Sequence, residues 1–299
     1  MNPGILYGLG AYLLWGMFPL YFRLLQRIPA LELVAHRVVW STTLIAVGIL
    51  VAGRGKAFLS VARSPRVWIA HSLTAVLIGI NWLVYVWGVN HGRVVECSLG
   101  YFLNPLVSVG LGVVVLRERL RTAQWIGVAL AGCGLVYLAA GQEGFPWLSL
   151  TLALSFGTYG LLKKRAPLES VDGLFAETLV LFLPALAWIA FRETPSQGPL
   201  HGATVLEWIL LIGTGIVTTV PLLLFSMSTR RIPLSLVGFL QYITPTIQFL
   251  IGIAVFHEAF SIRKLHGFAL VWFGLALVLA DGILKSARRT SPPRSSPNG

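Results

Sequence analysis

The chain has 299 residues and a formal net charge of +12, with 56% hydrophobic residues and only 11% charged residues. Soluble domains average about 25% charged residues, so this composition excludes a soluble enzyme, a nucleic-acid-binding protein and a disordered chain. A membrane-spanning helix needs about 20 apolar residues, and the length therefore allows about ten spans joined by short connections. We expect an all-α membrane protein embedded in the lipid bilayer.

Apolar runs separated by short polar breaks predict ten helices, at residues 4–24, 31–52, 68–89, 94–116, 122–140, 146–163, 173–191, 205–227, 234–256 and 265–283. The first run lacks a basic leader and is followed by further apolar runs. It is therefore interpreted as the first span and not as a cleaved signal peptide. The Ser-, Pro- and Arg-rich segment 285–299 is expected to be a disordered basic tail.

Basic residues are distributed unevenly between the loops, which predicts the orientation of the chain. With a cytoplasmic N-terminus, 16 of the 23 Lys and Arg residues lie in inner segments and six in outer segments, while Arg37 lies within a helix. We therefore expect both termini to be cytoplasmic and the protein to lie in the cytoplasmic membrane. Runs such as Lys163-Lys164-Arg165 are interpreted as inner anchors at the lipid headgroups.

The two halves of the chain resemble each other. Pro105, Gly112, Glu118, Gly127 and Gly134 recur as Pro245, Gly252, Glu258, Gly267 and Gly274, at a constant offset of 140 residues. Five helices per copy is an odd number, so the second copy must enter the membrane upside down. We expect two inverted five-helix repeats, 1–142 and 143–284, an architecture typical of secondary transporters. Glu118 and Glu258 end their helices and are expected to be structural.

Ionisable residues within a span are costly, so each one is a candidate for function. Three are well embedded in the predicted helices: Arg37, Glu96 and Glu177. Arg37 and Glu177 are repeat counterparts at the 140-residue offset. We expect them to form a gate pair or a proton site, or else to reach the outer and inner interfaces separately.

Two further titratable groups have local partners along the chain. Glu96 lies three residues after Arg93 on one helix face, which predicts a local ion pair, with a place at the outer mouth of the pathway as the alternative. His36 follows Glu32 by one helical turn, which predicts a hydrogen bond between them. His36, Glu96 and Glu177 are the candidates for coupling to a proton gradient.

Polar and aromatic residues gather on the third, fourth, eighth and ninth predicted helices, which correspond across the repeat. The candidates for a substrate-binding cavity are Asn81, Trp82, Tyr85, Tyr101, Asn104, Thr218, Gln241 and Tyr242. Pro105, Pro221 and Pro245 are predicted helix breaks, because each frees a carbonyl one turn back. Amides and hydroxyls can satisfy such carbonyls or bind a solute, and aromatic faces can stack on it. Polar packing between helices is the alternative.

Longer motifs extend over nearly the whole chain apart from the tail. They include His36-Arg37-Val38-Val39-Trp40-Ser41, Asn81-Trp82-Leu83, Glu96-x-Ser98-Leu99-Gly100-Tyr101-Phe102-x-Asn104-Pro105-Leu106 and Gly238-Phe239-x-Gln241-Tyr242. In these motifs the chain resembles the RarD-type permeases, in the EamA branch of the drug/metabolite transporter superfamily. The resemblance implies a ten-helix inverted repeat, a central cavity built largely by the motif-bearing helices, and transport of small metabolites or drugs.

The sequence thus predicts a secondary transporter, an exporter of small molecules that works by alternating access. It contains no Walker motif, so ATP is not expected to drive it directly. A lipid flippase on the same scaffold is an alternative. A membrane transferase is disfavoured because no two carboxylates share an embedded turn. We expect no enzymatic activity, cofactor, metal or nucleic-acid partner, and the oligomeric state stays open.

Overall fold

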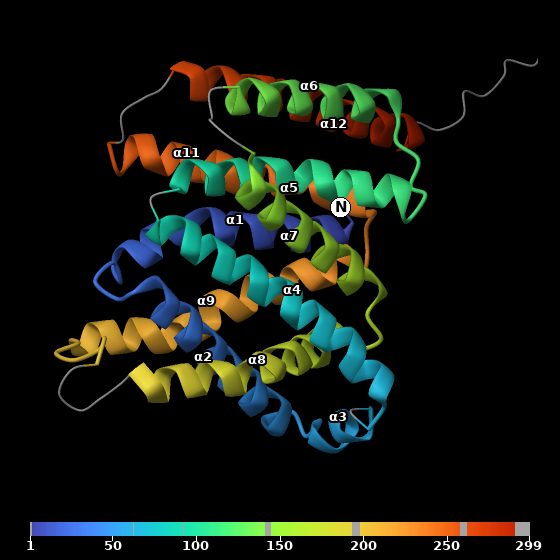
Figure 1. Ribbon diagram of the computed structural model, residues 1–299. Helices are drawn as coiled ribbons and strands as arrows, with labels where there is room; N and C mark the ends of the chain where they lie inside the picture. Colours follow the sequence, from blue (N-terminus) through green and yellow to red (C-terminus); the bar gives the residue numbers. More distant parts are fainter. Residues whose placement is uncertain are drawn as a thin grey trace, which may run out of the picture. The chain divides into compact units, whose positions relative to one another are not determined.

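A computed structural model describes residues 2–61, 63–91, 93–140, 145–192, 198–257 and 262–290. Within these ranges the regular structure is entirely helical, which confirms the all-α prediction (Figure 1). The helices are α1 (Pro3–Arg23), α2 (Ala30–Val51), α3 (Gly55–Val61), α4 (Pro65–Asn90), α5 (Val94–Val114), α6 (Thr122–Ala139), α7 (Trp147–Arg165), α8 (Ser170–Arg192), α9 (Val205–Thr229), α10 (Leu234–Gln241), α11 (Ile243–Ala254) and α12 (Ile262–Thr290). In the described part, eight helical segments are long and apolar enough to cross a membrane, by length and composition.

Each of the ten predicted segments is helical, with differences at α3 and at the prolines. The seven-residue helix α3 was not predicted. The predicted helix 234–256 is divided at Tyr242 into α10 and α11, because Pro245 in the first turn of α11 cannot donate to the Gln241 carbonyl. Pro105 and Pro221 instead lie inside the continuous helices α5 and α9. The prediction that they break their helices is wrong, since flanking bonds and packed neighbours tolerate one missing hydrogen bond.

Helix α12 is described through Thr290 and so includes residues 285–290 of the segment expected to form the tail. Lys, Ala and Arg in this segment are strong helix formers. Residues 291–299 lie outside the described ranges. Glu258 and the predicted repeat boundary at 142–143 lie outside them as well.

The chain divides into two compact units, of which the smaller comprises residues 119–143 and 260–299. Its helices α6 and α12 pack along each other. A Cβ added at Gly134 would lie 2.9 Å from the Gly267 carbonyl oxygen, and one at Gly274 would lie 3.0 Å from that of Gly127. The two backbones therefore meet at small residues, as is typical of membrane helices. These glycines form two pairs at the 140-residue offset.

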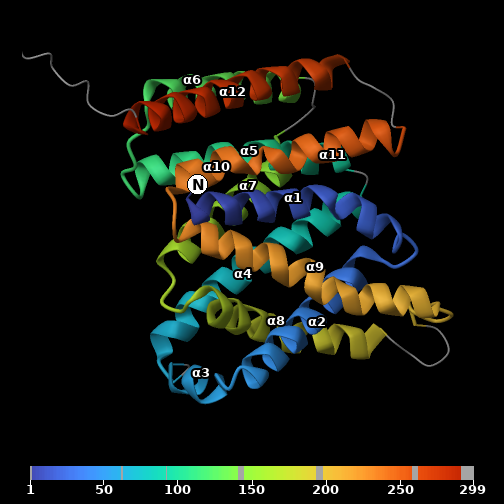
Figure 2. The ribbon, with the colours of Figure 1, turned by 180° about the vertical axis from the view of Figure 1, so that it is seen from behind.

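The larger unit comprises residues 1–118 and 144–259, and its helix contacts occur in matching sets. Helix α1 packs on α9 and α11, while α7 packs on α4 and α5. Helices α2 and α8 pack on each other, and they also pack on α9 and α4, respectively (Figures 1 and 2). Each contact therefore has a counterpart when the helices of the first predicted repeat are exchanged with those of the second.

The end of α5 shows how one predicted structural residue acts. Arg117 has a φ of 55°, and His257, 140 residues later, has a φ of 52°. The left-handed turn at Arg117 brings the Glu118 carboxylate to the start of α10, where it accepts hydrogen bonds from Leu234 N at 2.7 Å and Ser235 N at 2.8 Å. A carboxylate at a helix N-terminus also complements the helix dipole. The structural role predicted for Glu118 is confirmed.

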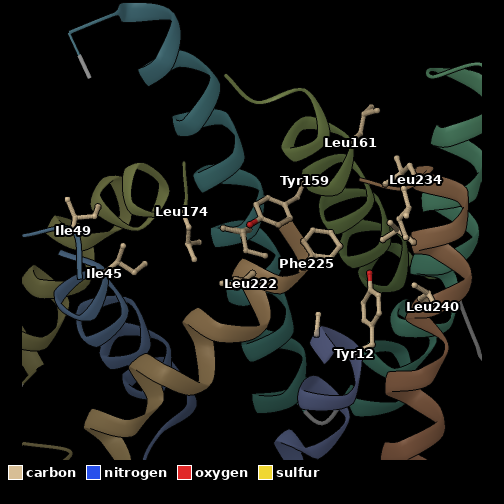
Figure 3. Close-up of a cluster of buried hydrophobic side chains, with 14 residues drawn as sticks. Tyr12, Ile45, Ile49, Tyr159, Leu161, Leu174, Leu222, Phe225, Leu234 and Leu240 are labelled. Carbon is tan, nitrogen blue, oxygen red and sulfur yellow. The ribbon is translucent and has the colours of Figure 1, made fainter. Parts of the chain in front are cut away.

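An aromatic cluster forms the core of the larger unit. The rings of Tyr159 on α7 and Phe225 on α9 stack with centroids 5.9 Å apart, and Tyr12 on α1 meets Phe225 edge-on at 6.3 Å. Figure 3 shows Leu222 and Leu234 beside these rings. The cluster joins α1, α7 and α9 and lies directly against the candidate site.

Candidate functional site

A cavity of about 370 Å³ lies within the larger unit, in the size range of small-molecule pockets. Its lining residues on α4, and all of those on α1 except Tyr12, belong to the C-terminal halves of those helices, whereas those on α2 and α5 lie in the N-terminal halves or, for Asn104, at the midpoint. The cavity therefore lies toward the end of the bundle where α1 ends and α2 begins. Helices α7, α9, α10 and α11 complete its wall.

Most of the predicted cavity residues do line this cavity. They are Asn81, Trp82, Tyr85, Tyr101, Asn104 and Gln241, joined by the predicted helix-break residue Pro245. Thr218 and Tyr242 are not among the lining residues. Thr218 accepts a hydrogen bond from Arg37 Nε, and Tyr242 is buried outside the lining. The expectation that these two residues line the cavity is not met.

Four amides line the cavity and differ in what they offer a solute; one of them, Gln248, donates to the Trp15 carbonyl at 3.3 Å. Asn81 donates to the Leu152 carbonyl at 2.9 Å and to Ser155 Oγ at 3.0 Å, and Gln241 Nε2 donates to Ser108 Oγ at 3.0 Å. Both side chains therefore also serve helix packing. Asn104 Oδ1 is buried without a hydrogen-bond partner in the described part of the chain, so this oxygen is available as an acceptor.

Sequence reasoning missed the contribution of α1. Tyr12, Trp15, Phe18 and Phe22 line the cavity from this helix, and Phe156 joins them from α7. The α1 residues are spaced by three, three and four positions, which places them on one helix face. That aromatic stripe was a usable signal for a lining helix.

Arg37 lies in the cavity wall, surrounded by aromatic rings. Its Nε donates to Thr218 Oγ1 at 2.9 Å, and its guanidinium carbon lies 4.7 Å from the Trp82 ring centroid and 5.5 Å from that of Phe22. Cation–π contacts of this kind stabilise a partly desolvated charge. Among the described residues, no carboxylate forms an ion pair with Arg37.

Glu177 on α8 binds a different cation from the one expected. Its carboxylate accepts from Lys163 Nζ at 3.0 and 3.1 Å, from Thr74 Oγ1 at 2.7 Å and from Tyr159 Oη at 3.2 Å. His71 Nδ1 lies 3.3 Å from the same carboxylate. We call these five residues the Glu177 network.

The Glu177 network overturns three expectations. The Lys163 and Glu177 side chains are 1% and 2% exposed, so Lys163 is no headgroup anchor and Glu177 does not reach the inner interface. The predicted pair of Arg37 with Glu177 is also wrong. Lys163 on the adjacent helix α7 neutralises the carboxylate directly, whereas the Arg37 guanidinium binds Thr218 on α9.

Of the two local side-chain pairs predicted from the sequence, the structure forms one and not the other. Arg93 Nε donates to Glu96 Oε1 at 2.7 Å, which confirms the local ion pair. His36 Nε2 lies 3.9 Å from Glu32 Oε1, beyond hydrogen-bond distance, and neither ring nitrogen has a hydrogen-bond partner in the described ranges. The predicted His36–Glu32 hydrogen bond is therefore absent.

Glu32 is a further embedded charge, in addition to the three predicted from the sequence. Its side chain is only 1% exposed and accepts from Trp188 Nε1 at 3.1 Å.

Comparisons with known proteins agree with the fold. The model of the EamA-like transporter family matches twice, over residues 2–140 and 145–280. Protein RarD of Streptomyces exfoliatus is 45% identical over 289 residues, covering 97% of this chain and 91% of that protein. An uncharacterized transporter of Pseudomonas aeruginosa is 40% identical over 294 residues, covering 98% of both. One solved crystal structure, 22% identical, matches with a TM-score of 0.69 over 94% of this chain and 99% of its own, a similarity of fold.

Proposed function

Because this chain belongs to the EamA-like transporter family, we propose that it is a secondary transporter that exports small metabolites or drugs across the cytoplasmic membrane by alternating access. Membership makes it a membrane transporter of the drug/metabolite superfamily. The observation that carries the finer proposal is the cavity of about 370 Å³, lined by amides, tyrosines and aromatic rings from both halves of the chain. A pathway for an amphipathic solute needs this combination of polar anchors and apolar walls.

The proposal includes ten spans arranged as two inverted repeats, with both termini cytoplasmic. Three observations support it: the family model matches each half once, the helix contacts occur in matching sets, and left-handed residues recur at Arg117 and His257. Basic residues concentrate in the segments that this topology places inside. In this orientation the cavity lies in the outer half of the bundle.

The proposed inner closure is the aromatic core together with the Glu177 network. Tyr12 lines the cavity and contacts Phe225, Phe225 stacks on Tyr159, and Tyr159 donates to Glu177. This continuous chain of contacts leads from the cavity toward the predicted inner face. Opening that face requires α4, α7 and α8 to separate, which breaks the hydrogen bonds of Glu177. Glu177 and the neighbouring His71 are the proposed coupling groups.

The direct test is counterflow in proteoliposomes that contain the purified full-length chain and no ATP. We expect a labelled aromatic or amphipathic metabolite to enter only when liposomes are preloaded with a competing solute. Asn104→Ala is expected to reduce this flux more than Leu99→Ala, a change at a similarly buried position on the same helix. A strict ATP requirement would contradict the proposal. Movement of a fluorescent phospholipid between leaflets without solute flux would favour the flippase alternative.

A further inference from the structure

Among the residues that the structure describes, the cavity wall contains one charged side chain, and it is positive. No Asp or Glu lines the cavity in the described part of the chain, and Arg37 is the one Lys or Arg among the lining residues. Buried or capping acids elsewhere in the described part of the larger unit have their own contacts: Glu177 binds Lys163, Glu96 binds Arg93, Glu118 caps α10, and Glu32 accepts from Trp188. The cavity is therefore electrostatically unbalanced.

From this imbalance we propose that the transported solute is a net-negative organic acid, a carboxylate or phosphate attached to an aromatic or apolar body, and that Arg37 binds its acid group. The inference rests on the proposed transport function and names its substrate class. A desolvated charge without a counter-ion is unfavourable. A solute anion supplies the missing counter-charge when the cavity is occupied.

The hydrogen-bond geometry of Arg37 agrees with this role. Guanidinium carries five N–H donors in a planar fork. Nε is engaged by Thr218 Oγ1, and no acceptor among the described residues is bonded to the two terminal nitrogens. Terminal nitrogens of arginine bind carboxylate and phosphate in a bidentate manner. The bond to Thr218 and the rings of Trp82 and Phe22 hold the fork in place.

The rest of the cavity specifies the body of the solute. The rings of Phe18, Phe22 and Trp82 lie around the Arg37 guanidinium, and Trp15 also lines the cavity, so an aromatic or apolar group packs there. The free Asn104 Oδ1 accepts from an N–H or O–H group of the solute. With no acid to pair an ammonium group, the lining disfavours organic cations and zwitterionic amino acids.

The test compares three probes of one shape and different charge: 1-naphthoate, 1-naphthamide and 1-naphthylmethylammonium. Binding to the purified full-length protein is measured by isothermal titration calorimetry at neutral pH. We expect naphthoate to bind at least about tenfold more tightly than naphthamide, and the ammonium probe to bind more weakly than both. Arg37→Gln abolishes the preference for naphthoate, while Arg37→Lys keeps part of it. Arg66→Gln, which removes an exposed charge at the other end of α4, leaves the preference unchanged.

Several results would overturn the inference. They are equal affinities for naphthoate and naphthamide, no naphthoate binding at millimolar concentration, or a preference that survives Arg37→Gln. If Arg37→Gln does not fold, as judged by thermal unfolding, Arg37→Lys decides, since full retention of affinity in a monodentate cation contradicts bidentate recognition. Counterflow distinguishes failure of the anion inference from failure of the proposed transport function. ATP-free flux confined to neutral or cationic solutes refutes the anion inference and leaves the transporter. Anion binding without any flux refutes the transporter and leaves the site.

Discussion

The buried pair of Lys163 and Glu177 provides a sharp test of how the bundle is held together at the Glu177 network. Lys163→Met keeps the apolar stem of the side chain but removes the ammonium group that donates to both carboxylate oxygens at 3.0 and 3.1 Å. Glu177 then keeps the hydroxyls of Thr74 and Tyr159 and the contact with His71. It loses the lysine charge that compensates its own.

Removing one partner of a buried ion pair costs about 3–5 kcal/mol, because the other charge stays desolvated and unpaired. The remaining hydrogen bonds to Glu177 place the expected loss for Lys163→Met at the lower end, about 3 kcal/mol. Adding Glu177→Gln removes the orphaned charge and leaves one amide oxygen, which still accepts from one of the two hydroxyls, while the amide NH2 can donate to the other hydroxyl oxygen. The double variant is therefore expected to recover about 1.5 kcal/mol or more of that loss.

The assay is thermal unfolding of the four proteins of this double-mutant cycle in one detergent, with Lys56→Met as the control because Lys56 is exposed. We expect each single variant to unfold at a clearly lower temperature than wild type, the double variant to unfold above Lys163→Met, and the control to match wild type. Strictly additive losses would refute the reasoning, because they would mean that Lys163 and Glu177 do not stabilise each other.

Three further predictions concern smaller parts of the structure. Asn104→Ala is expected to lower counterflow at least about tenfold relative to Leu99→Ala, the loss of about 1.4 kcal/mol from one solute hydrogen bond; equal rates would remove Asn104 from the site. Gly134→Ala places a methyl 2.9 Å from a backbone oxygen of α12, while Gly132→Ala meets nothing within 4 Å. Thermal unfolding should therefore show a loss of about 1–3 kcal/mol for the former alone. Glu118→Gln weakens the cap of α10 and should cost about 1 kcal/mol in the same assay, and an unchanged melting temperature would contradict the capping role.

Local patterns explain why the helices and their correspondence were predictable. Apolar runs of spanning length mark each helix, and the 140-residue offset relates the glycines at which α6 and α12 meet, Gly134 with Gly274 and Gly127 with Gly267. The break at Tyr242 also followed from a local rule, the missing amide of Pro245. The same rule failed at Pro105 and Pro221 because tertiary packing holds those helices continuous.

The candidate site was predictable only in part because it depends on which helix faces meet. Asn104 and Gln241 were found from their residue types beside prolines. Lys163 was misassigned, since a basic residue at a helix end resembles an anchor until the fold brings Glu177 of α8 against it. Glu32 was overlooked for a similar reason, because its burial depends on contacts such as that with Trp188 on α8.

The most direct measurement of the central claim asks whether the cavity opens to both sides of the membrane. Val34, a lining residue, is replaced by cysteine in a chain whose Cys97 and Cys133 are changed to serine, and a membrane-impermeant maleimide is applied to oriented vesicles. Alternating access predicts labelling from the outer face and, more slowly, from the inner face, with Lys163→Met raising the inner rate. Labelling from one face only, unchanged by Lys163→Met, would contradict the account.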